Sequence, residues 1–197
     1  MQASTATGTS LSGGDGAVEL LCRIRRADRP VVLIDGGSGS GKTTLAVALA
    51  PVLGAQLVRL DDVYPGWDGL EAGSVHVHDS VLTPTPRWRR WDWIADAPGE
   101  WHTLDPARPL VVEGSGSLSR TNRALATFGI WVELDAPARK VRALERDGDS
   151  YAPYWDRWAA QEARFAAREH PRELADVVVE DDDVMSLIAQ LSAPPLG

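Results

Sequence analysis

The sequence predicts an α/β protein in which a five-stranded parallel sheet lies between two layers of helices, a three-layer sandwich. Two observations predict this fold. Short apolar runs typical of buried parallel strands alternate along the chain with segments of helical spacing, and parallel strands are usually joined by crossover helices. In addition, a glycine-rich motif over 36–44 lies between the first apolar run and the helix that follows it, an arrangement typical of α/β folds.

The elements follow one another in a regular order. The first strand, 31–34, is a purely apolar run (VVLI) after Pro30, and the last ends just before an acidic cluster at 180–183. Residues 63–107 show little clean periodicity, and so long a segment inside a compact domain is usually functional. We expect one domain over 17–192, with disordered tails over 1–16 and 193–197. Further strands are predicted over 56–60, 109–112, 129–134 and 176–179, and helices over 17–26, 45–50, 135–146, 155–169 and 182–191.

The glycine-rich motif matches the phosphate-binding P-loop pattern G-x-x-x-x-G-K-[ST], with a strand before it and a helix after it. Its glycines let consecutive backbone N–H groups turn toward phosphate oxygens, and the positive end of the helix dipole adds to the attraction. We expect Lys42 to reach the β- and γ-phosphates and the Thr43 hydroxyl to bind Mg²⁺. The sequence thus predicts a site for ATP and Mg²⁺ built from Gly37, Ser38, Gly39, Ser40, Gly41, Lys42, Thr43 and Thr44.

The bulk composition limits the partners of the protein. Its net charge of −8 and pI near 5.0 argue against a nucleic-acid partner, which needs a basic face. Cys22 is the only cysteine, which excludes an internal disulfide and is consistent with the reducing cytoplasm. No apolar run approaches the ~20 residues of a membrane span, and residues 1–16 lack the features of a signal peptide. We expect a cytoplasmic protein that binds a small molecule and no membrane, as a monomer or a homodimer.

Acidic side chains stand at the ends of three predicted strands. Glu113 follows an apolar strand, where nucleotide-binding folds keep a carboxylate for Mg²⁺; a helix cap or a surface position is the alternative. Asp61 follows the second strand and is expected to accept the proton of an attacking hydroxyl. Asp62 should point elsewhere or cap the next segment. Asp35 is either a further aid to the metal or a turn residue before the glycines.

Three arginines, Arg139, Arg142 and Arg146, recur at i, i+3 and i+7 and therefore share one face of a predicted helix. A solvated arginine face is the usual meaning of such spacing. In a P-loop domain, however, arginines after the fourth strand can neutralise the charge that shifts between donor and acceptor. We expect Arg142 and Arg146 to act in this way.

Tryptophans are concentrated in the central segment. Tryptophan in a polar, proline-rich stretch forms either the core of a small subdomain or a wall on which a ring stacks. We expect most of them to form such a core. The triplet Trp91-Asp92-Trp93 differs, because its aromatic rings could stack on a planar substrate while Asp92 binds hydroxyls. The tryptophans of the central segment are Trp67, Trp88, Trp91, Trp93 and Trp101.

In order, these motifs resemble those of the uridine kinase and phosphoribulokinase group of P-loop kinases, over residues 30–180. The P-loop is similar to the family's first motif. The stretch 60–64 (LDDVY), which ends in Tyr64, is similar to its D-S-F-Y element, and 91–93 (WDW) to its Y-D-F element. Residues 111–114 (VVEG) resemble its V-x-E-G strand, and Arg142 with Arg146-Asp147 its R-x-x-x-R-D lid segment. The sequence departs from the family after 93 and after 147, where the base-reading histidine and a second arginine pair are replaced.

The resemblance implies a nucleoside/nucleotide kinase-like P-loop NTPase fold, with an acceptor-binding insertion over 62–108 and a lid over 138–170. It implies that Asp61 is the catalytic base, that Glu113 serves Mg²⁺ and that the acceptor site includes Asp61, Tyr64, Trp91 and Asp92. We therefore expect a kinase that transfers the γ-phosphoryl group of ATP to a hydroxyl of a small, nucleoside-like molecule. The alternatives are another acceptor, namely a nucleoside monophosphate, a sugar acid or an antibiotic, or a nucleotide-switched binding protein. The catalytic residues would be Lys42, Asp61, Arg142 and Arg146.

Overall fold

The computed structural model describes residues 9–10 and 16–192 of the chain. The disordered tails predicted over 1–16 and 193–197 fall almost wholly outside these residues. Within them, Thr9–Ser10 forms a short strand and Gly16 begins the first helix.

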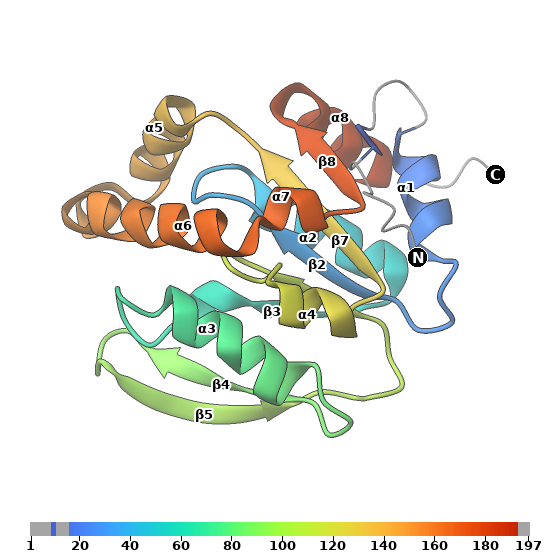
Figure 1. The fold of residues 1–197 in the computed structure, drawn as a ribbon, viewed down its shortest axis with the longest axis horizontal. Helices are drawn as coiled ribbons and strands as arrows, with labels where there is room; N and C mark the ends of the chain where they lie inside the picture. Colours follow the sequence, from blue (N-terminus) through green and yellow to red (C-terminus); the bar gives the residue numbers. More distant parts are fainter. Residues whose placement is uncertain (1–8, 11–15, 193–197) are drawn as a thin grey trace.

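A parallel sheet with the strand order β1-β8-β7-β2-β6-β3 forms the centre of the molecule (Figure 1). The α/β fold and all five predicted strands are confirmed, and the two-residue strand β1 pairs with β8 at one edge as a sixth. From the central strand β2 the chain first builds one side of the sheet and then the other. The strands are β1 (Thr9–Ser10), β2 (Val31–Asp35), β3 (Gln56–Arg59), β6 (Leu110–Glu113), β7 (Phe128–Glu133) and β8 (Val177–Glu180).

Helices cover both faces of the sheet, because successive residues of each strand point to opposite faces. In β2, Val32 and Ile34 belong to a first hydrophobic core, which they form with α1, α2 and α8 on one face of the sheet. Val31 and Leu33 belong to a second core on the other face, with α3 and α6. The predicted three-layer sandwich is thus present. The helices are α1 (Gly16–Ile24), α2 (Lys42–Leu53), α3 (Leu70–His76), α4 (Arg120–Leu125), α5 (Ala136–Asp147), α6 (Trp155–Glu169), α7 (Pro171–Leu174) and α8 (Asp181–Ser192).

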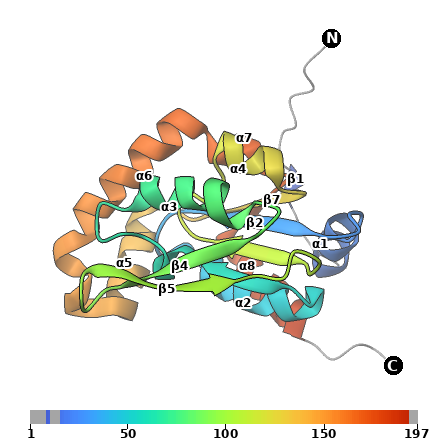
Figure 2. The same cartoon turned by 90° about the horizontal axis from the view of Figure 1, so that it is seen from below.

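The central segment is ordered and consists of α3, a π-helical turn over Val77–Val81 and the antiparallel hairpin of β4 (Arg87–Asp92) and β5 (Ala97–Thr103). Figure 2 shows the hairpin as a separate ribbon across one side of the molecule, apart from the main sheet. Trp88 stacks on His102 at a centroid distance of 4.2 Å and packs against the second core. Trp88 therefore packs in a core, as predicted for most of the tryptophans, but that core includes residues of the main sheet and is not that of a separate subdomain. Among the described helices, none is long and apolar enough to cross a membrane.

Candidate active site

The P-loop joins the buried strand β2 to helix α2, as its pattern requires. Gly41 precedes the helix in a left-handed conformation, with φ of 98°, and no side chain caps the helix N-terminus. In the described part of the chain, the N–H groups of Lys42, Thr43 and Thr44 have no hydrogen-bond acceptor. Unpaired N–H groups at a helix start form an anion-binding site. The Lys42 ammonium lies 3.5 Å from the Gly37 carbonyl oxygen, at the mouth of the same loop.

Thr43 and Glu113 meet beside the P-loop, as the sequence predicted. The Thr43 hydroxyl lies 3.2 Å from each carboxylate oxygen of Glu113, whose other close partner is the Arg59 guanidinium at 3.5 Å. Burial raises the pKa of the Glu113 carboxyl, an effect that Lys42 opposes and the nearby Asp61 charge reinforces. Mg²⁺ is commonly held by one or two carboxylates together with substrate phosphates and water. The hydroxyl and carboxylate oxygens here are donors of the kind that Mg²⁺ prefers.

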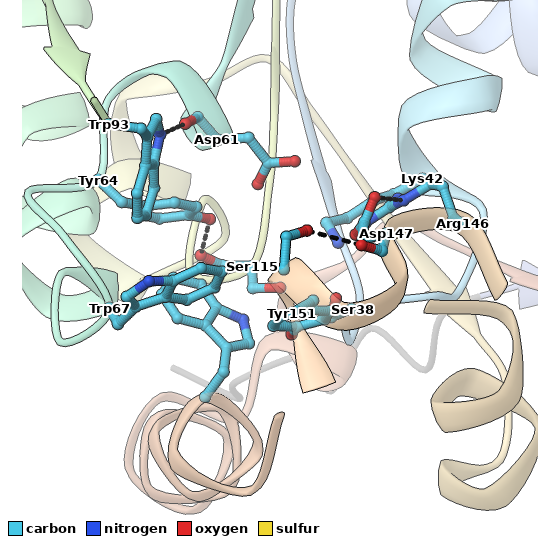
Figure 3. A pocket seen from close by; sticks show the side chains of 12 residues that line it. Ser38, Lys42, Asp61, Tyr64, Trp67, Trp93, Ser115, Arg146, Asp147 and Tyr151 are labelled. Carbon is cyan, nitrogen blue, oxygen red and sulfur yellow. Dashed lines mark hydrogen bonds and ion pairs between the residues drawn. The ribbon is translucent and has the colours of Figure 1, made fainter. Parts of the chain in front are cut away.

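A cavity of about 190 Å³ opens next to the P-loop. Figure 3 shows Lys42 and Arg146 on one side, Tyr64, Trp67 and Trp93 on the other, and the Asp61 carboxylate between them. The cavity therefore has a polar, phosphate-binding end and an aromatic end. Its lining residues are Ser38, Lys42, Asp61, Tyr64, Trp67, Trp93, Ser115, Arg146, Asp147, Ser150, Tyr151 and Trp158.

Asp61 lies in a short 3-10 turn directly after β3, with its side chain at the cavity. The Trp93 indole nitrogen donates to the Asp61 carbonyl oxygen at 2.9 Å, which ties the hairpin to this turn. Asp62 lines a different hollow, together with Arg90. Of the two aspartates, the structure places only Asp61 beside the P-loop lysine.

The three arginines of α5 lie in three different environments. Arg146 lines the cavity and forms an ion pair with Asp147 at 2.6 Å, which raises the pKa of its guanidinium. Arg142 instead pairs with Asp181 at 2.6 and 2.9 Å and does not line the cavity. Of the predicted catalytic pair, only Arg146 therefore lines the cavity. Arg139 contacts the P-loop directly, donating to the Ser38 carbonyl oxygen at 3.2 Å.

Two residues predicted for acceptor binding, Trp91 and Asp92, lie in the hairpin and line the outer hollow instead of the cavity. Asp92 organises the hairpin turn, because its Oδ1 accepts the N–H groups of Ala95 and Ile94 at 3.0 and 2.9 Å. These two hydrogen bonds lower the pKa of its carboxyl. Of the triplet 91–93, only Trp93 reaches the cavity. The triplet is thus divided between the cavity and the outer hollow.

Aromatic residues from the central segment and from residues 151–158 form the far wall of the cavity. Trp67 stacks on Tyr151 and Tyr154, with centroid distances of 5.4 and 4.3 Å, and Trp158 meets Tyr64 edge to face at 4.7 Å. Burial raises the pKa of the Tyr64 hydroxyl, which donates to the Ser115 carbonyl oxygen. Tyr64 was expected at the site. Tyr151 and Trp158 were missed, because their sequence spacing gives no sign that residues 151–158 reach the central segment.

Asp35 is a structural residue. Its buried carboxylate accepts the N–H groups of Gly36, Gly116 and Leu118 at 2.7–3.1 Å, which fastens the loop after β6 to the P-loop strand. Burial raises its pKa to about 6 despite these hydrogen bonds and the charge of Lys42. The turn interpretation of Asp35 is therefore the one that the structure supports.

Glu162 of α6 was not singled out from the sequence, yet its carboxylate contacts the P-loop. It accepts the Ser38 N–H at 2.7 Å and pairs with Arg139 at 3.0 Å. The amphipathic pattern of α6 predicts a helix face that packs on the domain. It does not show that an acid on that face reaches a loop more than a hundred residues away.

No family model matches the sequence. Two curated proteins with similar sequences are each named tRNA dimethylallyltransferase. The protein of Alkalilimnicola ehrlichii is 27% identical over 154 residues, which cover 73% of this chain and 49% of its own. That of Syntrophobacter fumaroxidans is 36% identical over 103 residues, covering 46% and 30%. The chain thus spans about half or less of the length of these relatives.

Solved structures of kinases have a similar fold. One described as a possible uridine kinase from Bacillus stearothermophilus superimposes with a TM-score of 0.56 at 21% identity, covering 83% of this chain and 97% of that chain. A gluconokinase from Sinorhizobium meliloti 1021 does so with a TM-score of 0.50 at 15% identity, covering 85% and 94%. The chain therefore has the fold of the P-loop kinases.

Proposed function

We propose that this protein is an ATP- and Mg²⁺-dependent kinase that transfers the γ-phosphoryl group to a hydroxyl of a small, uncharged, ring-bearing molecule. One observation carries the proposal. A single cavity joins the P-loop lysine Lys42, the carboxylate of Asp61 and the lid arginine Arg146 to a wall of aromatic rings. A phosphoryl donor, a base and an acceptor surface are the parts that such a transfer needs.

In the proposed reaction the acceptor oxygen attacks the γ-phosphorus while its proton passes to the Asp61 carboxylate. The bond between the γ-phosphorus and the β–γ bridging oxygen breaks, and ADP leaves with the electron pair. Lys42 and Arg146 would offset the charge on the phosphoryl oxygens. Mg²⁺, bound through Thr43 and Glu113 together with phosphate oxygens, would neutralise further charge. The aromatic rings would keep water away from the transferred group.

The charges of the cavity favour an uncharged acceptor. Lys42 and Arg146 are balanced by Asp61 and Asp147, and Arg146 is already paired with Asp147. The aromatic end of the lining thus offers no free cation to a phosphate or carboxylate group. An acidic acceptor would have needed the arginines of the central segment, and these do not line the cavity. Aromatic rings instead suit a flat or apolar ring.

An acceptor panel with ADP detection tests the proposal. Nucleosides and other uncharged ring alcohols should stimulate ADP formation, whereas nucleoside monophosphates and sugar acids should not. Stimulation by the acidic compounds alone would overturn the acceptor class. Slow hydrolysis that no acceptor accelerates would favour a nucleotide-switched binding protein.

Replacement of the proposed base tests the mechanism. Asp61→Asn should lower kcat by ~10²–10⁴-fold and leave the Kd for ATP close to that of the wild type, because proton acceptance is lost while the P-loop is intact. Asp62→Asn is the matched control, since Asp62 lies outside the cavity. Turnover of the Asp61→Asn variant at the wild-type rate would contradict the assignment.

The curated relatives support a second candidate, transfer of a dimethylallyl group to tRNA. A P-loop could bind the diphosphate of a dimethylallyl donor, and the aromatic wall would suit its apolar chain. The net charge of −8 is unfavourable for tRNA binding. Incubation with dimethylallyl diphosphate and tRNA separates the two: we expect no transfer, and dimethylallylated tRNA formed without ATP consumption would overturn the kinase proposal.

A further inference from the structure

The Glu162 carboxylate is the meeting point of four segments around the cavity. Its Oε1 accepts the Ser38 N–H of the P-loop at 2.7 Å and the Trp158 indole N–H at 3.0 Å. It also lies 2.8 Å from the Ser115 hydroxyl, whose single proton it shares with the Gly36 carbonyl oxygen at 3.0 Å. Its Oε2 accepts the Arg139 guanidinium at 3.0 Å. The P-loop, the loop after β6, the lid helix α5 and α6 thus share one acidic group.

This group is well shielded, since the Glu162 side chain is only 10% exposed. Hydrogen bonds to an ionised group are stronger than neutral ones, and a low local dielectric strengthens them further. The Ser38 N–H and the Trp158 indole N–H share one acceptor oxygen. A movement of the carboxylate would therefore change the geometry of both hydrogen bonds.

Two of these donors belong to opposite ends of the cavity. Ser38 is part of the predicted phosphate-binding loop, and Trp158 is part of the aromatic wall. A phosphate at the P-loop would bring negative charge near the Glu162 carboxylate and would repel it. The Trp158 indole N–H, bound to the same oxygen, would move with it.

We propose that Glu162 is a positioning residue that couples the P-loop to the aromatic wall, so that the bound nucleotide orients the surface on which the acceptor lies. The inference rests on the proposed function for its two ligands. The coupling itself can be measured with a nucleotide alone, without knowledge of the acceptor.

The test follows the Trp158 indole N–H signal in ¹H–¹⁵N NMR spectra, assigned by its loss in Trp158→Phe, while Mg²⁺ and the non-hydrolysable analogue AMP-PNP are added. In the wild type the signal should shift on AMP-PNP binding. In Glu162→Ala the nucleotide should still bind, but roughly tenfold more weakly, because the P-loop has lost a charged hydrogen-bond partner. The Trp158 shift should be lost, because no carboxylate then links Trp158 to the P-loop. Asp156→Asn, an exposed carboxylate of the same helix, should behave as the wild type.

Glu162→Gln keeps one acceptor oxygen and the side-chain volume, so the shift should be weakened yet present, and this variant carries the test if Glu162→Ala does not fold. A wild-type shift in both variants would overturn the coupling. So would an unresponsive Trp158 in wild-type protein that binds AMP-PNP. Failure of the wild type to bind AMP-PNP would instead overturn the proposed function, and the coupling with it.

Discussion

Three buried carboxylates hold the loops around the cavity, and each has a different set of partners. Asp35 accepts three backbone N–H groups, Glu113 contacts Thr43 and Arg59, and Glu162 gathers donors from four segments. A buried acid is costly unless it is hydrogen-bonded or paired. Asp35 and Glu113 lie at the carboxyl ends of strands, and Glu162 lies on α6. Their hydrogen bonds therefore fix the positions of the loops at this edge of the sheet.

Asp35 should make stability depend on pH. Between pH 4 and 6 the unfolded chain has lost the Asp35 proton while the folded protein keeps it, so the free energy of unfolding falls as pH rises. The shift from 3.8 to about 6 corresponds to about 3 kcal/mol. Urea unfolding of the wild type and Asp35→Asn from pH 4 to 7 measures this. The variant should lack that decrease, and equal slopes for the two proteins would contradict it.

Glu113→Gln tests the metal assignment. The neutral amide is a weaker ligand, so the Mg²⁺ concentration for half-maximal activity should rise by ~10-fold or more. Because burial raises the pKa of Glu113, the wild type should also need more Mg²⁺ as the pH falls and the carboxyl protonates. Kinetic titrations with Mg²⁺ at several pH values measure both effects. Glu145→Gln, an exposed acid of α5, is the control; an unchanged Mg²⁺ requirement in Glu113→Gln would refute the role.

At the scale of elements, helix α5 lies directly on the P-loop. Gly39 has φ of +85°, and a Cβ at this position would meet the Arg139 carbonyl oxygen and its adjoining backbone. The motif therefore needs glycine here for two reasons, the left-handed backbone and the close approach of the helix. Helix α5 and the P-loop are thus closely packed through main chain as well as side chains.

Gly39→Ala should destabilise the protein by about 1–3 kcal/mol and weaken nucleotide binding, because α5 has to move away from the loop. Gly54→Ala is a matched control: its φ of +61° imposes similar backbone strain, but no atom lies within 4 Å of the added methyl group. Thermal unfolding and nucleotide titrations of the two variants measure the difference. Equal losses in both would show that backbone strain alone is responsible.

The sequence predicted the sheet well because most of its strands contain apolar runs, and the central strands β2 and β6 are buried along their whole length. The hairpin was missed for a local reason. Arg87-Trp88-Arg89 alternates as a strand should, but a register shift between Arg89 and Trp91 breaks the period of two. Around the cavity, the motifs pointed to Lys42 and Asp61, which line it, and to Glu113, which contacts Thr43. The positions of Trp91, Asp92 and Arg142, and the contacts of Glu162, depend on long-range packing that no local pattern encodes.

At the scale of the whole molecule, the site lies where the connections of the sheet change direction. β2 lies between β6 and β7, and the chain builds the β6–β3 side before it crosses to β7 and β8. Ligands of open α/β sheets bind in the crevice at such a switch point, at the carboxyl ends of the strands. The P-loop follows β2, Asp61 follows β3, and Glu113 is the last residue of β6. A ligand there touches structure from both cores and should stabilise the domain as one unit.

Nucleotide binding should therefore raise the thermal unfolding midpoint. At a hundred times Kd, ATP with Mg²⁺ contributes about 2.7 kcal/mol, or a rise in Tm of ~5–10 °C for a domain of this size. Lys42→Ala should lose most of that rise, and Lys140→Ala, which alters an exposed lysine of α5, should keep it. Differential scanning fluorimetry measures both. A full ligand-induced rise in Lys42→Ala would contradict the phosphate-binding role of Lys42.

The two lysines of the chain differ sharply in their surroundings: Lys42 is 7% exposed within the cavity, whereas the Lys140 side chain is 47% exposed on α5. An amine-acylating reagent thus meets one sheltered target and one open target in the same molecule. The acylation of Lys140 would serve as an internal standard, and the ratio of the two modified peptides in a mass spectrum would report occupancy of the P-loop. Because the chain has only two lysines, the acylation of Lys42 relative to Lys140 would measure ligand binding without an added label.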